Sequence, residues 1–167
     1  LEIDLRKMGF TKVIEQNAPI CRWQIEDILV DIMPTQTRIL GFSNRWYQKA
    51  VDECGTAKLP SGTIIQIVKP EYFIATKIDA FLGRGKNDFI MSHDVEDIIT
   101  VIDGRPELIK EVWESATEVQ KFIQTYLNSF KESGDFCDAV LGFYPTDTIG
   151  QSRYAVFMER LEGICRQ

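Results

Sequence analysis

Charged side chains recur at regular intervals in residues 75–98, the segment ATKIDAFLGRGKNDFIMSHDVEDI. Lys77 and Arg84 are seven residues apart, so on a helix they lie on nearly the same face. Asp94 and Asp97 are three apart and share a face of a following helix. A lysine and an arginine on one face can hold phosphate groups, the lysine as a point charge and the arginine as a bidentate donor. The same four residues can instead form salt bridges between two helices, and the spacing alone favours this second interpretation.

A single carboxylate also interrupts an apolar run, because Asp31 lies within ILVDIMP. If the strand were covered on both faces, this charge would be costly to bury unless it bound a metal ion, a cation or hydrogen-bond donors. If the strand is half exposed, Asp31 simply points into water. The residues alone favour the exposed strand and leave the metal-binding role open.

Other motifs carry less chemistry. His93 beside Asp94 is typical of His-Asp metallohydrolases, but such a site needs further histidines and the chain has one. Gly83-x-Gly85 follows no strand, so it indicates the end of a helix and not a dinucleotide-binding loop. The four cysteines form no C-x-x-C pair, which favours buried free thiols over disulfides or zinc. A metal here would be a hard ion held by carboxylates, which points to Mg²⁺.

The elements that must position these residues fall into a β-rich half, 1–69, and a helical half, 70–167. In the first half the patterns predict a helix over 1–8 ended by Gly9, a strand from Thr11, a hairpin over 20–33, a helix begun by Ser43 or Asn44 and ended by Gly55, and a strand over 63–68. In the second half they predict helices over 70–83, 92–104, 106–131, 134–143 and 149–165. In the first of these helices Pro70 would lie in the first turn and Leu82 on the apolar side. In the second, Ser92 would be the cap and Gly104 would end the helix. The helix over 106–131 has the clearest apolar stripe. The expected fold class is therefore α/β in the broad sense, of the α+β type, with the helical half packed on the other.

Composition limits the classes of function. Hydrophobic residues make up 44% and charged residues 26% of 167 residues, and no apolar run reaches the roughly 20 residues needed to cross a bilayer. We expect a cytoplasmic protein that does not enter a membrane. The net charge of −6 gives no support to nucleic acid as a partner, although it does not exclude a local basic groove. The sequence begins without Met, and we expect residues upstream of Leu1.

Several segments together resemble the nucleotidyltransferase-fold superfamily, in particular the bacterial branch of AbiEii-like abortive-infection toxins and related uncharacterised nucleotidyltransferases. The resemblance covers about residues 1–105, and the segments that carry it are LRKMGF, ILVDIMP, ILGFSNRWYQKA, IIQIVKPEYFIATKIDAF and RGKNDFIMSHDVEDIITVIDGR. Each segment is short and weak evidence by itself, so the resemblance depends on the order and spacing of all five.

The resemblance implies a nucleotidyltransferase-like mixed sheet and Mg²⁺-dependent transfer of a nucleotidyl group from an NTP to an acceptor, within a toxin-antitoxin system. In that superfamily three carboxylates hold Mg²⁺, and Asp31 matches the third of them. Lys77 matches a lysine that lies near the nucleotide, and Arg84 follows it seven residues further along the same predicted helix. Asp94 and Asp97 match a later Asp motif that would orient Lys77 or the acceptor. The resemblance thus implies catalytic roles for Asp31, Lys77, Asp94 and Asp97, nucleotide binding by Lys77 and Arg84, and metal binding by Asp31.

The chain also departs from the family pattern. The 167 residues contain no Gly-Gly or Gly-Ser turn followed by Asp-x-Asp, and Glu2 and Asp4 fit the surface of a helix better than an acidic pair. One Asp31 cannot hold two metal ions, so we expect these residues to be inactive unless the missing part is supplied. The alternative is a non-catalytic binding or regulatory protein that retains the fold. It would act with a partner protein or as a homo-oligomer, and helix 106–131 would offer the partner face.

Overall fold

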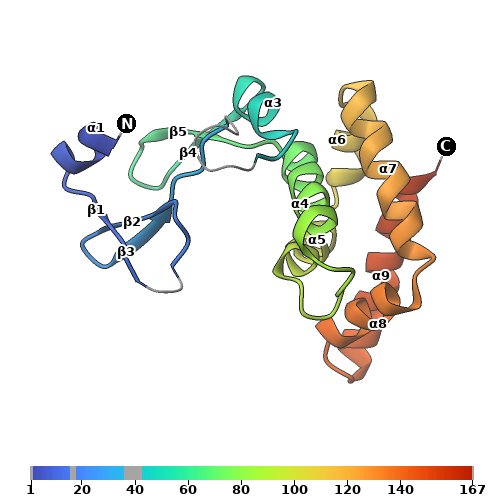
Figure 1. The fold of residues 1–167 in the computed structure, drawn as a ribbon. Coiled ribbons are helices and arrows are strands. Elements are labelled where there is room, and N and C mark those ends of the chain that lie inside the picture. The colour runs from blue at the N-terminus through green and yellow to red at the C-terminus, as the bar shows by residue number, and fades with distance from the viewer. Residues whose placement is uncertain (1, 16–17, 36–42, 167) are drawn as a thin grey trace. The chain divides into compact units, whose positions relative to one another are not determined.

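The computed structural model describes residues 2–15, 18–35 and 43–166, and the chain divides into two compact units, 1–43 and 44–167 (Figure 1). Each unit is described by itself. The segment ILGFSNRWYQKA starts at Ile39, so its residues 39–42 lie outside the described residues.

The first unit holds a helix and a small antiparallel sheet in the order β1-β2-β3. Its elements are α1 (Glu2–Lys7), β1 (Thr11–Lys12), β2 (Arg22–Ile25) and β3 (Ile28–Asp31). Gly9 has φ +90°, the left-handed conformation that glycine adopts readily just after a helix, which confirms the predicted helix end. The predicted hairpin is also confirmed, because β2 and β3 pair with Arg22 opposite Asp31 and turn at Glu26.

The second unit begins with a short helix and a second hairpin, α3 (Tyr47–Asp52), β4 (Gly55–Lys58) and β5 (Ile64–Ile67). The prediction that Ser43 or Asn44 caps this helix was wrong, because the cap position is Trp46. The Asn44 side chain accepts from the Trp46 amide at 3.0 Å and donates to the Thr76 carbonyl at 2.7 Å, so it lies outside the helix that it precedes. Gly55 does not end the helix but is the first residue of β4, a strand that the sequence patterns did not predict.

The rest of the unit is helical, as predicted. It comprises α4 (Pro70–Arg84), α5 (His93–Gly104), α6 (Leu108–Glu114), α7 (Thr117–Lys131), α8 (Gly134–Phe143) and α9 (Thr148–Cys165) (Figure 1). The core of this unit lies among these helices. Its largest fully buried side chains are Trp46, Tyr72, Phe81, Phe136, Phe157, Ile74, Ile78, Ile98, Ile99, Ile102, Leu108 and Ile123. Leu82 was expected on this apolar side of α4, but it is 42% exposed.

The single helix predicted over 106–131 was wrong, because Ser115 and Ala116 have extended backbones that separate α6 from α7. The Ser115 hydroxyl donates to the Val112 carbonyl at 2.7 Å, which competes with the helical bond that this carbonyl would otherwise accept. Val112 and Ile123 are fully buried, so much of the stripe on both helices packs into the core, whereas Trp113 is 39% exposed. The buried part of the stripe is therefore not a free face for a partner.

The four cysteines are free, and Cys165 at the end of α9 is buried. Burial raises the pKa of its thiol to about 11. Because the thiolate is the reactive form, we expect iodoacetamide at about pH 8 to leave Cys165 unmodified while it alkylates the less buried Cys54 and Cys137. Mass spectrometry of the native protein gives the order of labelling, and Cys165 labelled first would contradict the expectation.

The fold is thus of the α+β class, with small antiparallel sheets near the N-terminus and a helical C-terminal part. The strands described form two separate sheets, and none of their pairings is parallel. Among the described residues, no helix has both the length and the apolar character required to cross a membrane.

Candidate functional site

Two packed helices and their connection position the predicted cluster. α4 and α5 share an apolar contact in which Ile78 and Phe81 of α4 and Val95 and Ile98 of α5 are buried. Because this apolar contact holds the two helices together, it also holds their polar faces next to each other. As a result, Lys77 and Arg84 of α4 lie next to Asp94 and Asp97 of α5.

The connection between the two helices, residues 85–92, has a defined conformation. Lys86 and Asn87 have φ values of 51° and 60°, in the left-handed region that Asn tolerates better than most residues. The Asp88 carboxylate accepts from the Met91 amide at 3.0 Å, and the Ser92 hydroxyl accepts from the Val95 amide at 3.4 Å to cap α5. The predicted Ser92 cap is confirmed, and it places Asp94 in the first turn of α5.

Lys77, Arg84, Asp94 and Asp97 form one network of ion pairs. Arg84 donates from Nε and Nη2 to the two oxygens of Asp94, both at 2.9 Å. Lys77 Nζ lies 2.5 Å from Asp97 Oδ2 and 3.5 Å from Asp94 Oδ1. The structure therefore brings together four of the predicted site residues, with Asp94 joined to both cations.

Burial differs sharply within this network. The Asp94 side chain is 7% exposed, whereas that of Arg84 is 71% exposed. The hydrogen bonds to Asp94 raise the pKa of Arg84 above its ordinary value, so the guanidinium stays charged. Asp94 is the buried anchor of the network, and Arg84 presents its remaining N–H groups outward.

A pocket of about 430 Å³ opens beside Arg84 and Asp94. Lys86, Ser92 and Asp88 also line it, so two basic residues and a hydroxyl share this space with two carboxylates. Lys86 was missed in the sequence, although its position after Gly85 could have indicated a residue turned away from the helix. The His93 side chain is 95% exposed and lies 3.1 Å from Glu96, as expected for a histidine in the first turn of a helix.

Asp31 belongs to the other compact unit, at the end of β3. Both of its oxygens accept from Arg22, from Nε and Nη2, at 2.8 Å each. These hydrogen bonds lower the pKa of Asp31 below its ordinary value. The carboxylate is exposed, which matches the interpretation that the residues alone favoured.

The donor set does not fit a resident Mg²⁺. Mg²⁺ prefers oxygen ligands in an octahedral arrangement, and Asp31 supplies one carboxylate whose oxygens are already bound by a guanidinium. In the described part of the chain, no group of three or more His, Cys, Asp or Glu residues could hold a metal ion. We therefore derive no metal-dependent step from these residues.

The chain was compared with protein-family models, with curated proteins and with solved structures, and no match was found. The resemblance to nucleotidyltransferases thus remains a prediction from the sequence.

Proposed function

We propose that this chain is a nucleotidyltransferase-like protein whose α4–α5 network faces the phosphates of an NTP. The observation that carries the proposal is the asymmetry of the network, in which a buried Asp94 holds an exposed Arg84 in a bidentate pair. An arginine fixed on one edge keeps its other N–H groups available in a set direction. That arrangement suits a phosphate, which arginine binds through a planar fork.

The surroundings of Arg84 support a phosphate ligand. The pocket beside it has about 430 Å³, within the range of small-molecule sites, and Lys86 adds a second positive charge to its lining. Lys77 is three-quarters buried and lies within ion-pair distance of Asp94 and Asp97, so it offsets part of their negative charge behind Arg84. Asp94 and Asp97 orient Lys77, and Asp94 also orients Arg84.

The proposal extends to transfer of the nucleotidyl group to an acceptor, in a toxin-antitoxin role, because the matching segments resemble that branch. In this chain Mg²⁺ would arrive with the nucleotide as its counter-ion, since the described residues offer it no resident site. The 167 residues contain no Asp-x-Asp pair, so the carboxylates that hold Mg²⁺ during transfer would have to be supplied in addition to them.

A second candidate is a non-catalytic binding or regulatory protein that retains the fold. It is favoured by the Arg22 partner of Asp31, which occupies the carboxylate that would otherwise bind metal. Under this function the α4–α5 network is a tie between helices. A nucleotide can still bind, but nothing is transferred.

Arg84→Met is expected to weaken Mg·ATP binding about tenfold or more, because it removes the charge and the N–H groups but keeps the aliphatic stem. Isothermal titration calorimetry of the 167-residue chain with Mg·ATP measures this. Arg105→Met is the matched control, since Arg105 makes an equally bidentate pair with Glu111 on the same unit. It should bind as the wild type does.

The binding measurements test the nucleotide site, and a transfer assay then separates the two candidate functions. Absence of Mg·ATP binding by the wild-type chain, or equal weakening by both substitutions, would overturn the nucleotide site. If Mg·ATP binds, radiolabel transfer from α-labelled ATP, assayed with any residues that precede Leu1 in the natural protein included, distinguishes the enzyme from the binding protein. Label incorporated into an acceptor supports the enzyme, and binding without incorporation supports the second candidate.

A further inference from the structure

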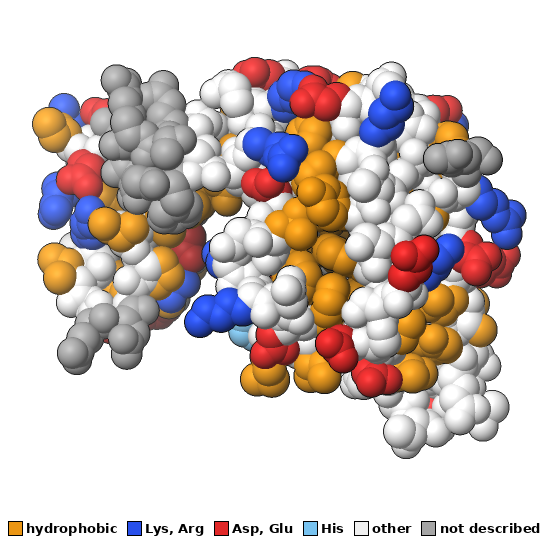
Figure 2. All heavy atoms as spheres, turned by 45° about the vertical axis from the view of Figure 1, so that its right-hand side comes forward, with side chains coloured by type: hydrophobic (Ala, Val, Ile, Leu, Met, Phe, Trp, Pro, Cys, Tyr) orange, Lys and Arg blue, Asp and Glu red, His pale blue; other side chains and the backbone are white. Residues whose placement is uncertain are grey.

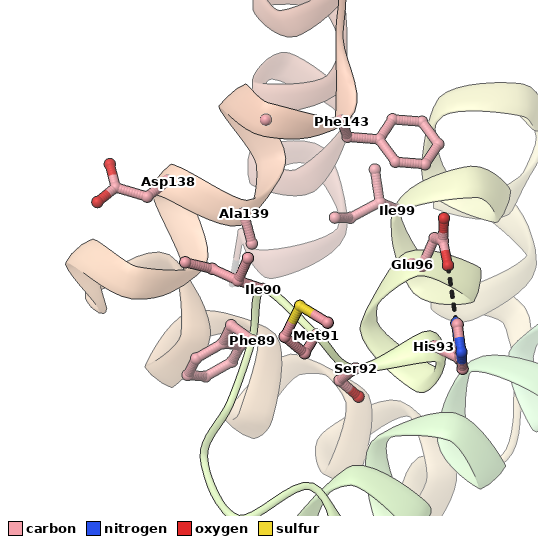
Figure 3. Close-up of a pocket in the computed structure, with 11 residues that line it drawn as sticks. Phe89, Ile90, Met91, Ser92, His93, Glu96, Ile99, Asp138, Ala139 and Phe143 are labelled. Carbon is pink, nitrogen blue, oxygen red and sulfur yellow. Dashed lines mark hydrogen bonds and ion pairs between the residues drawn. The ribbon is translucent and has the colours of Figure 1, made fainter.

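A groove distinct from the Arg84 pocket lies between α5, α8 and residues 89–92 (Figure 3). Its volume is about 340 Å³. We call it the α5–α8 groove, and its apolar lining comes mainly from Phe89, Ile90, Met91, Ile99, Ala139 and Phe143. Figure 3 shows the side chains of Ile90 and Met91 between the two helices.

Bulky apolar side chains are exposed next to one another at this groove. Ile90 is 67% and Met91 76% exposed, and Phe143 at the end of α8 is 37% exposed. The Asp88 carboxylate holds the Met91 amide, so the turn presents these side chains in a defined position. Contiguous apolar surface that stays exposed on a folded protein is a feature of binding sites.

The rim of the groove is acidic. Glu96 on α5 and Asp138 on α8 lie on opposite sides of it in Figure 3. The Glu96 carboxylate lies 3.1 Å from His93 Nδ1 and pairs with no lysine or arginine among the described residues. The Asp138 side chain makes no ion pair or hydrogen bond within the described part of the chain. Figure 2 likewise shows acidic side chains next to exposed hydrophobic ones on the helical unit.

These charges discriminate between occupants. Two copies of the chain that met groove to groove would bring Asp138 near a second acidic rim, and each copy carries a net charge of −6. Such a contact is electrostatically unfavourable. A partner with basic residues on either side of an apolar strip would pair with both rims and cover Ile90 and Met91.

We propose that the α5–α8 groove docks an amphipathic helix of a partner protein, with bulky apolar side chains on one face and lysine or arginine along its edges. The apolar floor between two helices matches the way an amphipathic helix inserts its apolar face into a groove. Glu96 and Asp138 then set the orientation by pairing with the basic edges. This inference does not require a nucleotide at the Arg84 pocket, although the two cavities share Met91, Ser92 and His93.

The test uses a fluorescein-labelled peptide of leucine and lysine, about 18 residues long so that it can form a helix, with its leucines at helical spacing. Fluorescence anisotropy with the whole chain should show binding that weakens as salt rises, because the rim contribution is screened. The same peptide with glutamate in place of lysine should not bind. The double variant Ile90→Ser/Met91→Ser should weaken binding about tenfold or more, and Asp138→Lys should weaken it to a similar degree.

Matched controls are available on α9. Ile149 is 72% exposed, so Ile149→Ser removes an equally exposed apolar side chain, and Glu159→Lys makes the same charge change as Asp138→Lys at another exposed position. Both should bind the leucine-lysine peptide as the wild type does, and thermal unfolding should show all variants folded. Equal weakening by the controls would show non-specific attraction and overturn the proposal. Analytical ultracentrifugation gives a second test. A dimer of the free chain that Ile90→Ser/Met91→Ser abolished would also overturn the proposal, because the occupant of the groove would then be a second copy.

Discussion

Replacing Gly150 with alanine is expected to destabilise the helical unit by about 3 kcal/mol, the upper part of the range for overpacking a tight site. Gly150 lies in the first turn of α9, where its amide donates to the Asp147 carboxylate at 2.8 Å. That cap folds the preceding turn back, and a β-carbon at position 150 would overlap the carbonyl oxygen of Pro145. Because the obstacle is backbone next to a proline, it cannot be relieved by a side-chain rotation.

Urea denaturation followed by far-UV circular dichroism measures this loss. Gly83→Ala is the matched control, because Gly83 is also inside a helix, α4, and a β-carbon there would meet nothing within 4 Å. Alanine should stabilise that position by about 0.5–1 kcal/mol, since it reduces the backbone entropy lost on folding. If Gly150→Ala left the free energy of unfolding unchanged, the Pro145 carbonyl could not lie as close to α9 as described.

The second large effect is expected for Asp94→Ala, which should destabilise the same unit by about 2 kcal/mol. The substitution removes the acceptor of two Arg84 hydrogen bonds and an acidic residue from the first turn of α5. We place the loss below that of a fully buried ion pair, because the Arg84 side chain is 71% exposed and remains hydrated when its partner is gone. Lys77 keeps its partner Asp97.

A double-mutant cycle with Arg84→Met isolates the pair. A coupling energy of about 1 kcal/mol is expected from urea unfolding of the two single variants and the double variant. Asp97→Ala is the control, because that carboxylate contacts Lys77 and is 44% exposed, and it should cost less than about 1 kcal/mol. A loss below about 0.5 kcal/mol for Asp94→Ala would contradict the role of Asp94 as the buried anchor.

The local order of helices and turns was predictable because each boundary carries its own signal. Helices begin at Pro70 and just after Ser92, and they end near Gly9 and at Gly104, as the backbone and capping chemistry of these residues indicated. The break at Ser115 was not predictable from periodicity, because both sides of it carry buried apolar residues in continuous helical spacing. Only the hydroxyl bond to Val112 distinguishes it, and a serine within a helix often makes such a bond without breaking the helix.

The candidate site was predictable in part. The spacing of Lys77 with Arg84, and of Asp94 with Asp97, placed each pair on one helix face, and the structure joins the two pairs. The spacing could not show which carboxylate is buried, since that depends on how α5 packs against α4. Nor could it show that Arg22 lies opposite Asp31, because that pairing depends on the register of β2 and β3.

The connection between α4 and α5 is shared by two cavities. Met91, Ser92 and His93 line both the Arg84 pocket and the α5–α8 groove. A ligand that moved these residues at one cavity would change the affinity of the other, and thermodynamic linkage requires the effect to be reciprocal. If the nucleotide strengthened docking of the helix by some factor, the docked helix would strengthen nucleotide binding by the same factor.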